Sequence, residues 1–180
     1  MKGLILKNIL LIITVILIDC SFINAQGVES GKIFVGPSIE TSIPVGKLAV
    51  LGFAAGGEYM VGDNFGVLFD FSIITYHEES SLVHTSTMDL SVVAPCLFLS
   101  YHFNDKSTWD PFIALGVGYS IVNGSVSSPS GGSSSFFDKP QKLIIPQLKI
   151  GLRYWVTEQW AVRGNIGFYR ALSAGFDYTL

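Results

Sequence analysis

The chain has 180 residues, enough for one domain of ordinary size. Only 14% of its residues are charged, against about 25% in an average soluble domain, whereas 49% are hydrophobic. The formal net charge of −3, without any basic stretch, excludes nucleic acid as an expected partner.

The N-terminal segment has the composition of a cleavable export signal. Two lysines precede an apolar run over residues 9–18, and small or polar residues follow up to Ala25. This run has half the ~20 residues that a membrane-spanning helix needs. We therefore expect a secretory signal peptide at residues 1–25, cleaved after Ala25, rather than a retained anchor. The domain that remains is residues 26–180.

The cysteines add one alternative and one exclusion. Cys20 could be acylated if the leader were that of a lipoprotein, but Asp19 stands where such leaders need a small residue. After cleavage Cys96 is the one cysteine left, so an intramolecular disulfide is excluded and the fold must be held together by its sheet.

The rest of the chain is expected to cross a membrane in strands. Beyond the signal, no apolar run approaches the ~18 residues of a helical span. Apolar residues occur instead in segments of strand composition, most of them near the ~9–11 residues that cross a bilayer at a tilt. Eight segments are predicted: residues 32–40, 50–60, 65–76, 88–103, 111–122, 143–156, 160–168 and 171–180.

Period-2 alternation is clearest late in the chain. In segment 111–122, Leu115 and Val117 fall on one face, and Ala114, Gly116 and Gly118 on the other. The three segments that follow alternate in the same way. In segment 88–103 the apolar residues change parity on either side of Pro95, and proline is tolerated at bulges, so we predict a β-bulge there.

The connections alternate in length. In chain order they lie at residues 41–49, 61–64, 77–87, 104–110, 123–142, 157–159 and 169–170. The odd-numbered ones are mostly long and the even-numbered ones mostly short, and the last is an exception because it is very short. Long loops at one end and tight turns at the other are typical of an up-and-down barrel with both termini in the periplasm. The fold class predicted is therefore all-β, an eight-stranded antiparallel up-and-down transmembrane β-barrel.

Two features favour a membrane barrel over a soluble, lipocalin-like barrel with an apolar interior. The less apolar face is rich in glycine and alanine, as the narrow interior of an eight-stranded barrel requires. Aromatic residues also gather near the strand ends, as in the girdles at headgroup depth. One girdle is predicted from Tyr59, Phe65, Tyr101, Phe103, Trp109, Phe112, Tyr154, Trp155, Trp160 and Tyr178, and the other from Tyr76, Tyr119, Phe168 and Tyr169.

The few charges on the small-residue face have both signs. In a narrow interior they must pair, because an unpaired buried charge is costly, and a paired network would plug the barrel rather than open a pore. The predicted network of the barrel interior comprises Glu58, Asp70, Asp89, Lys149, Arg153, Arg163 and Asp177.

The C-terminal strand carries the closest approach to a motif. Phe176, Tyr178 and Leu180 alternate at the end of the chain, and the mature chain as a whole resembles the small eight-stranded outer-membrane barrels of the OmpA transmembrane-domain and OmpX type. The resemblance implies an outer-membrane location, contact with outer-membrane lipids, and insertion by the barrel-assembly machinery, which reads such a C-terminal signal. Leu180 departs from the aromatic residue that usually ends these barrels.

No residue pattern indicates a cofactor or a metal site. One set of residues, His84 and Ser86 with Glu78 or Asp89, resembles the catalytic residues of barrel esterases that trim lipid A, but Thr87 stands where those enzymes have an asparagine. We expect a non-enzymatic, porin-like barrel with a structural or surface-interaction role through its outer loops, where an extracellular ligand would bind. A narrow passive channel, a lipid-modifying esterase and a soluble barrel are the alternatives.

Overall fold

A computed structural model describes residues 28–42, 50–80, 86–103, 108–127, 133–135, 139–168 and 170–180. The predicted signal peptide at residues 1–25 lies outside the described residues. No helix in these ranges is long and apolar enough to cross a bilayer. The described chain forms strands β1 (Ile33–Ser42), β2 (Leu51–Met60), β3 (Phe65–Ser80), β4 (Ser86–His102), β5 (Trp109–Ser127), β6 (Ser133–Ser135), β7 (Gln141–Trp155), β8 (Trp160–Gly167) and β9 (Arg170–Thr179).

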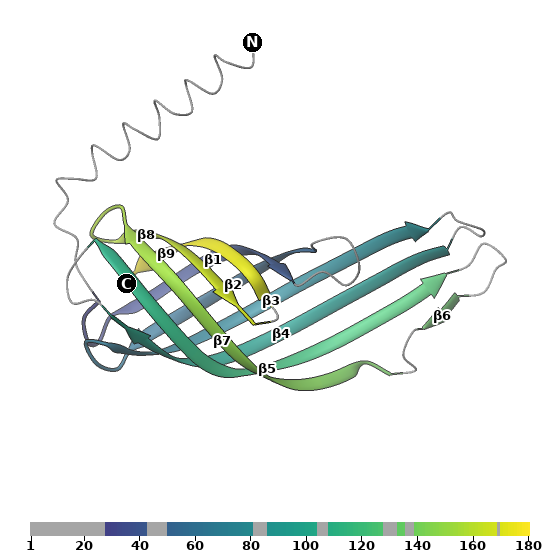
Figure 1. Ribbon diagram of the computed structural model, residues 1–180, viewed down its shortest axis with the longest axis horizontal. Coiled ribbons are helices and arrows are strands. Elements are labelled where there is room, and N and C mark those ends of the chain that lie inside the picture. The colour runs from purple at the N-terminus through teal and green to yellow at the C-terminus, as the bar shows by residue number, and fades with distance from the viewer. Residues whose placement is uncertain are drawn as a thin grey trace, which may run out of the picture.

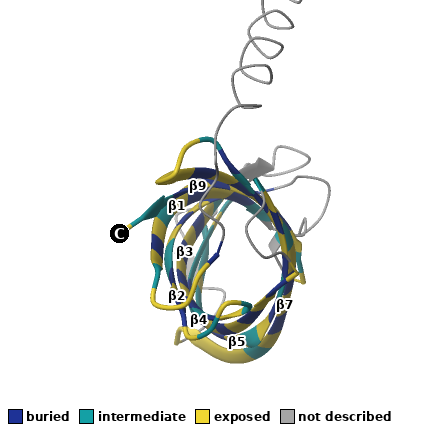
Figure 2. Ribbon diagram, turned by 90° about the vertical axis from the view of Figure 1, so that its left-hand side faces the viewer, coloured by how far each residue is buried: buried dark blue, intermediate teal, exposed yellow. Residues whose placement is uncertain are grey.

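Eight of these strands close into a barrel (Figures 1 and 2). Each pairs antiparallel with its neighbours, and β1 closes the ring by pairing with both β2 and β9. β6 is a short addition that pairs with the end of β5. The predicted fold class, an eight-stranded antiparallel up-and-down barrel, is confirmed. Closure satisfies the backbone groups of every strand without leaving a sheet edge in contact with lipid.

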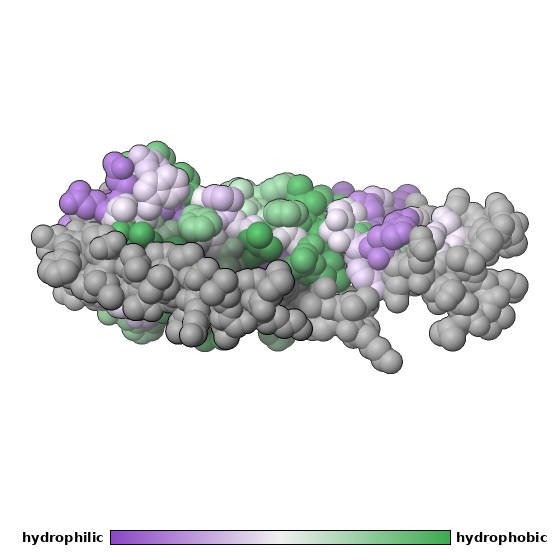
Figure 3. Space-filling view, turned by 90° about the horizontal axis from the view of Figure 1, so that it is seen from above, coloured by the Kyte–Doolittle hydropathy of each residue, from purple (hydrophilic) through white to green (hydrophobic). Residues whose placement is uncertain are grey.

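Alternate residues along each strand point to opposite sides of the barrel wall. In β5, Ala114 is 0% exposed, whereas its neighbour Leu115 is 62% exposed. The same pattern puts Leu, Ile, Val and Phe side chains outside and most charged ones inside, and hydrophobic residues gather over the middle of the visible surface (Figure 3). This arrangement is the opposite of a soluble barrel with an apolar interior, and it is the orientation that the sequence predicts for a barrel in a bilayer.

The wall is taller on one side than on the other. β3, β4 and β5 have 16, 17 and 19 residues, whereas β2 and β8 have 10 and 8. The three long strands extend beyond the other barrel strands at one end, where β6 pairs with β5 (Figure 1). We call this the loop end, and the end with the short connections 61–64 and 156–159 the turn end. The predicted loop at residues 77–87 is thus wrong in part, because strand pairing continues to Ser80 and Ser86.

The bulge predicted at Pro95 is also wrong. The β3–β4 register keeps one offset from Phe65 opposite Tyr101 to Ser80 opposite Ser86, and Pro95 lies opposite Phe71 within it. The β4–β5 ladder lacks pairs at Ala94 and Pro95, as expected for a residue without an N–H, but it resumes in the same register.

The change in apolar parity has a different cause. On the outward face, the row Ile73, Val93 and Ile121 is followed toward the loop end by the row Thr75, Ser91 and Asn123. The outward face thus turns from apolar to polar, and the apolar Leu90 and Val92 fall on the inward face. Polarity inverts where the strands pass from lipid to water, so the register needs no reset.

Candidate functional site

The inward face near the turn end begins with an apolar layer. Phe34, Met60, Trp155 and Ala161 come from four different strands and are buried together with Val28. The rings of Phe34 and Trp155 lie with their centroids 5.4 Å apart. Trp155 therefore belongs to the interior, as does Phe112, which is 2% exposed, and their predicted place in an outer girdle is wrong.

Arg153 lies next to this layer and is fully buried. Its guanidinium donates from Nε to Asp177 Oδ2 at 2.7 Å, from Nη1 to Asp110 Oδ2 at 3.1 Å, and from Nη2 to Glu58 Oε2 at 2.6 Å. Its Cζ also lies 4.4 Å from the centroid of the Phe34 ring. A planar fork of donors suits such a site, because one arginine can bind several carboxylates at fixed directions.

His102 joins two of the same carboxylates. Its Nδ1 lies 2.9 Å from Asp110, and its Nε2 lies 2.9 Å from Glu58 Oε1, which also accepts a hydrogen bond from Ser100 Oγ. Carboxylates only accept hydrogen bonds, so both ring nitrogens can donate at once only as an imidazolium. The His102 ring also stacks on Phe112, with centroids 5.6 Å apart.

Arg163 completes the charged layer, with Nη1 3.3 Å from Asp177 Oδ1. Three carboxylates, those of Glu58, Asp110 and Asp177, are then matched by two guanidinium groups and the imidazolium. Because the positive and negative charges balance within hydrogen-bond distance, their burial avoids the cost of an isolated ion.

A second apolar layer and a second ion pair lie farther toward the loop end. Leu68, Cys96, Phe98, Phe112 and Ala114 form the layer. Lys149 Nζ pairs with Asp70 and lies 4.5 Å from the centroid of the Phe98 ring. Both charged side chains are largely buried.

Six of the seven residues predicted for the interior network therefore face inward: Glu58, Asp70, Lys149, Arg153, Arg163 and Asp177. Four of them lie in one cluster, and Asp70 and Lys149 form the separate pair. The prediction is wrong for Asp89, whose side chain is 55% exposed and pairs at 2.5 Å with the exposed His77. Asp89 lies on the outward face beyond the point of polarity inversion.

The sequence interpretation missed His102 and Asp110. Asp110 was assigned to a connection, but it is the second residue of β5 and is buried. Phe98 and Ser100 lie on the inward face of β4, and His102 is the next residue in the same alternation. Continuing the alternation by two residues would have placed His102 on the inward face. Two buried polar residues on adjacent strands at the same end of a barrel are a signal for a paired network.

Residues predicted for the C-terminal signal and for the aromatic girdle lie on the outer wall of the barrel. Phe176 and Leu180 are exposed on the outer wall. Tyr101, Phe65 and Phe103 form a chain of edge contacts there, with centroids 5.1 and 5.0 Å apart, and Trp109–Tyr154 and Trp160–Tyr178 are further pairs at the turn end.

Little of the suspected esterase set can be placed. His84 and the side chains of Glu78 and Ser86 lie outside the described residues. In the ranges that are described, no group of three or more His, Cys, Asp or Glu side chains is arranged to hold a metal ion.

Several solved structures resemble this chain, among them the following three. OprG from Pseudomonas aeruginosa is 14% identical with a TM-score of 0.62, covering 87% of this chain and 99% of its own. Ail, the attachment invasion locus protein of Yersinia pestis, is 15% identical with a TM-score of 0.59, covering 84% and 99%. Neisserial surface protein A is 15% identical with a TM-score of 0.51, covering 82% and 92%. No family model and no curated protein matches the sequence.

Identities this low show a shared fold. The chain is a membrane β-barrel protein. Its fold is that of the small eight-stranded outer-membrane barrels, of the OmpA transmembrane-domain and OmpX type, as the sequence predicts.

Proposed function

We propose that the protein is a non-enzymatic outer-membrane barrel with a closed interior, which acts through the surface that its loop end presents outside the cell. The single observation that carries the proposal is the burial of Arg153 with its three carboxylates. A water-filled channel through the barrel would have to pass this cluster, and its side chains would then be in contact with water.

The layers on either side support a closed interior. The cluster of Phe34, Met60 and Trp155 lies on one side, and the cluster of Leu68, Phe98 and Phe112 on the other. Eight strands give a barrel just wide enough for side chains to fill. Together the two apolar layers and the ionic layer occupy the inner face over the turn-end half of the wall.

The tall side of the wall supports a role at the surface. β3, β4 and β5 carry polar residues on their outward face beyond the apolar band, so this part of the sheet stands in water outside the outer leaflet. Ail is named for attachment and invasion, and one Ail structure is a complex with the heparin analogue sucrose octasulfate. A surface-interaction role for this chain agrees with the name and the complex of Ail, and a structural role in the membrane would use the same barrel.

Planar-bilayer recording of the purified, refolded protein tests the closed interior. We expect no steady ion conductance from the wild-type barrel. The gel mobility of the same preparation before and after boiling serves as the control for folding. Steady single-channel steps from the wild type would overturn the proposal and favour a narrow passive channel.

The absence of enzymatic activity has its own test. Lipid A from cells that express the wild-type protein should have the same mass spectrum as lipid A from cells that express Ser86→Ala. A species that depends on Ser86 would instead establish the lipid-modifying esterase.

Export and insertion are also part of the proposal. We propose that the signal peptide is removed after Ala25 and that the barrel-assembly machinery recognises Phe176, Tyr178 and Leu180. N-terminal sequencing of the membrane-extracted protein should begin at Gln26. Removal of Leu180 should lower the folded fraction in cells but not after refolding in vitro, and equal folded fractions in cells would contradict this role.

A further inference from the structure

A cavity of about 510 Å³ lies at the loop end, on the sheet formed by β3, β4 and β5. Its volume falls within the range of about 300–1,000 Å³ that is usual for small-molecule sites. The chain segment before β7 contributes Lys139 and Pro140 to its lining. The cavity shares no residue with the charged network of the interior.

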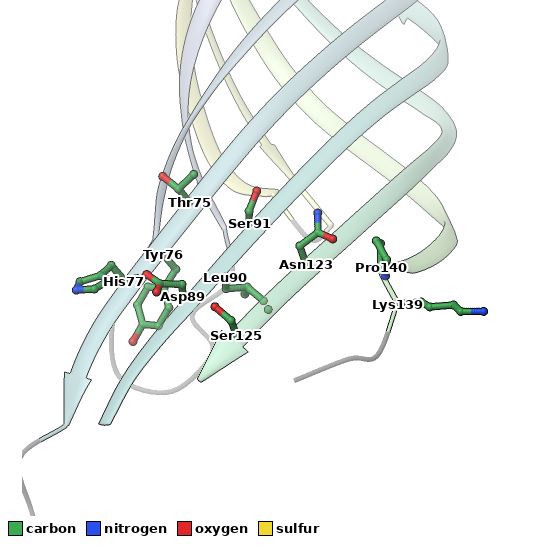
Figure 4. Close-up of a pocket in the computed structure, with 11 residues that line it drawn as sticks. Thr75, Tyr76, His77, Asp89, Leu90, Ser91, Asn123, Ser125, Lys139 and Pro140 are labelled. Atoms are coloured by element: carbon green, nitrogen blue, oxygen red, sulfur yellow. Dashed lines mark hydrogen bonds and ion pairs between the residues drawn. The ribbon is translucent and has the colours of Figure 1, made fainter. Parts of the chain in front are cut away.

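Polar side chains from three strands line this cavity in two cross-strand rows (Figure 4). The register places Thr75 opposite Ser91 and Ser91 opposite Asn123 in one row, and it places His77 opposite Asp89 and Asp89 opposite Ser125 in the next. These six residues share the face that carries Ile73, Val93 and Ile121 one step closer to the middle of the barrel. The cavity therefore lies at the first polar level beyond the apolar band, where the sugars of outer-leaflet glycolipids and soluble glycans can both reach it.

The lining has little net charge. Asp89 pairs with His77, with 2.5 Å between Oδ1 and Nδ1. Among the described lining residues Lys139 is the single lysine or arginine, so the cavity lacks the group of cations that recognition of a phosphate or sulfate requires. The ligand that fits this charge distribution is uncharged.

The lining instead offers many neutral hydrogen-bonding groups. The Asn123 amide both donates and accepts, as do the hydroxyls of Thr75, Ser91 and Ser125. Pro140, from the segment before β7, adds apolar surface. An uncharged sugar has hydroxyl groups around a ring whose faces are C–H rich, and it therefore matches a lining that is polar and apolar in turn.

We propose that this cavity binds an uncharged sugar unit. The unit comes either from a glycolipid of the same membrane or from a soluble glycan, since the cavity lies within reach of both. The proposal rests on the proposed function, because it requires the loop end to face the outside of the cell. It adds the ligand class and the site through which a surface-interaction role would operate.

The experiment uses isotope-labelled protein in phospholipid nanodiscs, titrated with the neutral trisaccharides maltotriose, cellotriose and chitotriose. We expect at least one of them to shift the amide resonances of Ser91 and Asn123. Asn123→Ala should weaken that binding by about tenfold, because the amide makes hydrogen bonds that no neighbour replaces. Gln159→Ala, an exposed residue in a turn at the opposite end, is the matched control and should bind as the wild type does.

A second arm identifies the source of the sugar. Lipopolysaccharide is added to the nanodiscs, and the same resonances are followed. Lipopolysaccharide shifts that free trisaccharide replaces with the shifts of its own complex support the site and assign it to a membrane glycolipid. Binding of the free trisaccharide alone supports the site and assigns it to soluble glycans.

The proposal is overturned if neither the trisaccharides nor lipopolysaccharide move these resonances. It is also overturned if the folded Asn123→Ala variant, checked by its gel mobility before and after boiling, binds as tightly as the wild type, or if inorganic sulfate binds where neutral sugars do not. These results leave the conductance measurement unchanged, so a failed sugar site and a failed closed barrel are distinguishable.

Discussion

At the scale of single residues, Arg153 joins the charged side chains of the interior into one network. Its side chain contacts Glu58, Asp110 and Asp177, which come from three different strands. Sequence parity predicted that Arg153 faces inward with two of these carboxylates. Sequence parity did not predict the third carboxylate, that of Asp110. This residue lies at the start of a strand, and the sequence around it has the composition of a connection.

Arg153→Ala should lower the free energy of unfolding by about 3–5 kcal/mol, since it leaves three buried carboxylates without their shared partner. Urea unfolding in lipid vesicles, followed by tryptophan fluorescence, measures this loss. Lys142→Ala, an exposed position on the same strand, is the control and should change stability by less than about 0.5 kcal/mol. A cost for Arg153→Ala as small as that of the control would show that the charged layer contributes nothing to folding.

Asp89 shows why residue type alone cannot assign an interior charge. It has the same residue type as Asp70 and lies in the next strand, but the outward face changes character between Val93 and Ser91. Exposure of the Asp89 carboxylate to water carries no free-energy penalty, whereas its exposure to lipid would carry a large one. The position of the membrane boundary is a property of the closed barrel, and the sequence of one strand does not contain it.

At the scale of strands, the alternation of β5, β7, β8 and β9 was predictable because one face is apolar and the other small or polar throughout. The extensions of β3 and β4 were not, because residues 77–80 and 86–87 are polar and read as a loop. They become strands because each finds a partner in register on the neighbouring strand. Pairing of backbone groups, rather than side-chain propensity, forms these parts of the sheet.

Charge placed on the outward face of β5 should have different effects at two heights. Leu115→Arg puts a guanidinium in the middle of the apolar band and should cost about 2–4 kcal/mol, whereas Asn123→Arg, on the same face beyond the band, should cost no more than about 1 kcal/mol. Unfolding of both variants in vesicles gives the comparison. Equal costs would mean that the boundary does not fall between these two residues.

Gly116 marks a close approach of two strands. A methyl group at Gly116 would lie 2.0 Å from the carbonyl oxygen of Leu97, on β4, whereas one at Gly164 would meet nothing within 4 Å. Gly116→Ala should therefore cost at least about 1–3 kcal/mol through overpacking, and Gly164→Ala should be neutral or slightly stabilising. Thermal or urea unfolding of the two variants separates these outcomes, and a neutral Gly116→Ala would show that β4 and β5 are farther apart.

At the scale of the whole molecule, a single orientation links the composition to the proposed function. Low charge, strand-length apolar segments and small inward residues are all consequences of a barrel whose outside contacts lipid and whose inside is filled. In the part of the chain that the structure describes, the same orientation places the tall loop end of β3, β4 and β5 beyond the apolar band. The number of strands and their faces follow from the sequence, whereas the height of each strand depends on pairing across the ring.

The three tryptophans of the chain test this orientation most directly. Trp109 and Trp160 are 51% and 50% exposed on the outer wall, and Trp155 is 1% exposed in the interior. Three variants, each keeping one tryptophan and replacing the other two with phenylalanine, are refolded into vesicles that contain brominated lipid. We expect strong fluorescence quenching of Trp109 and of Trp160 and little of Trp155. Strong quenching of Trp155 with none of the other two would contradict the account, because the side of the wall that faces lipid would be the opposite one.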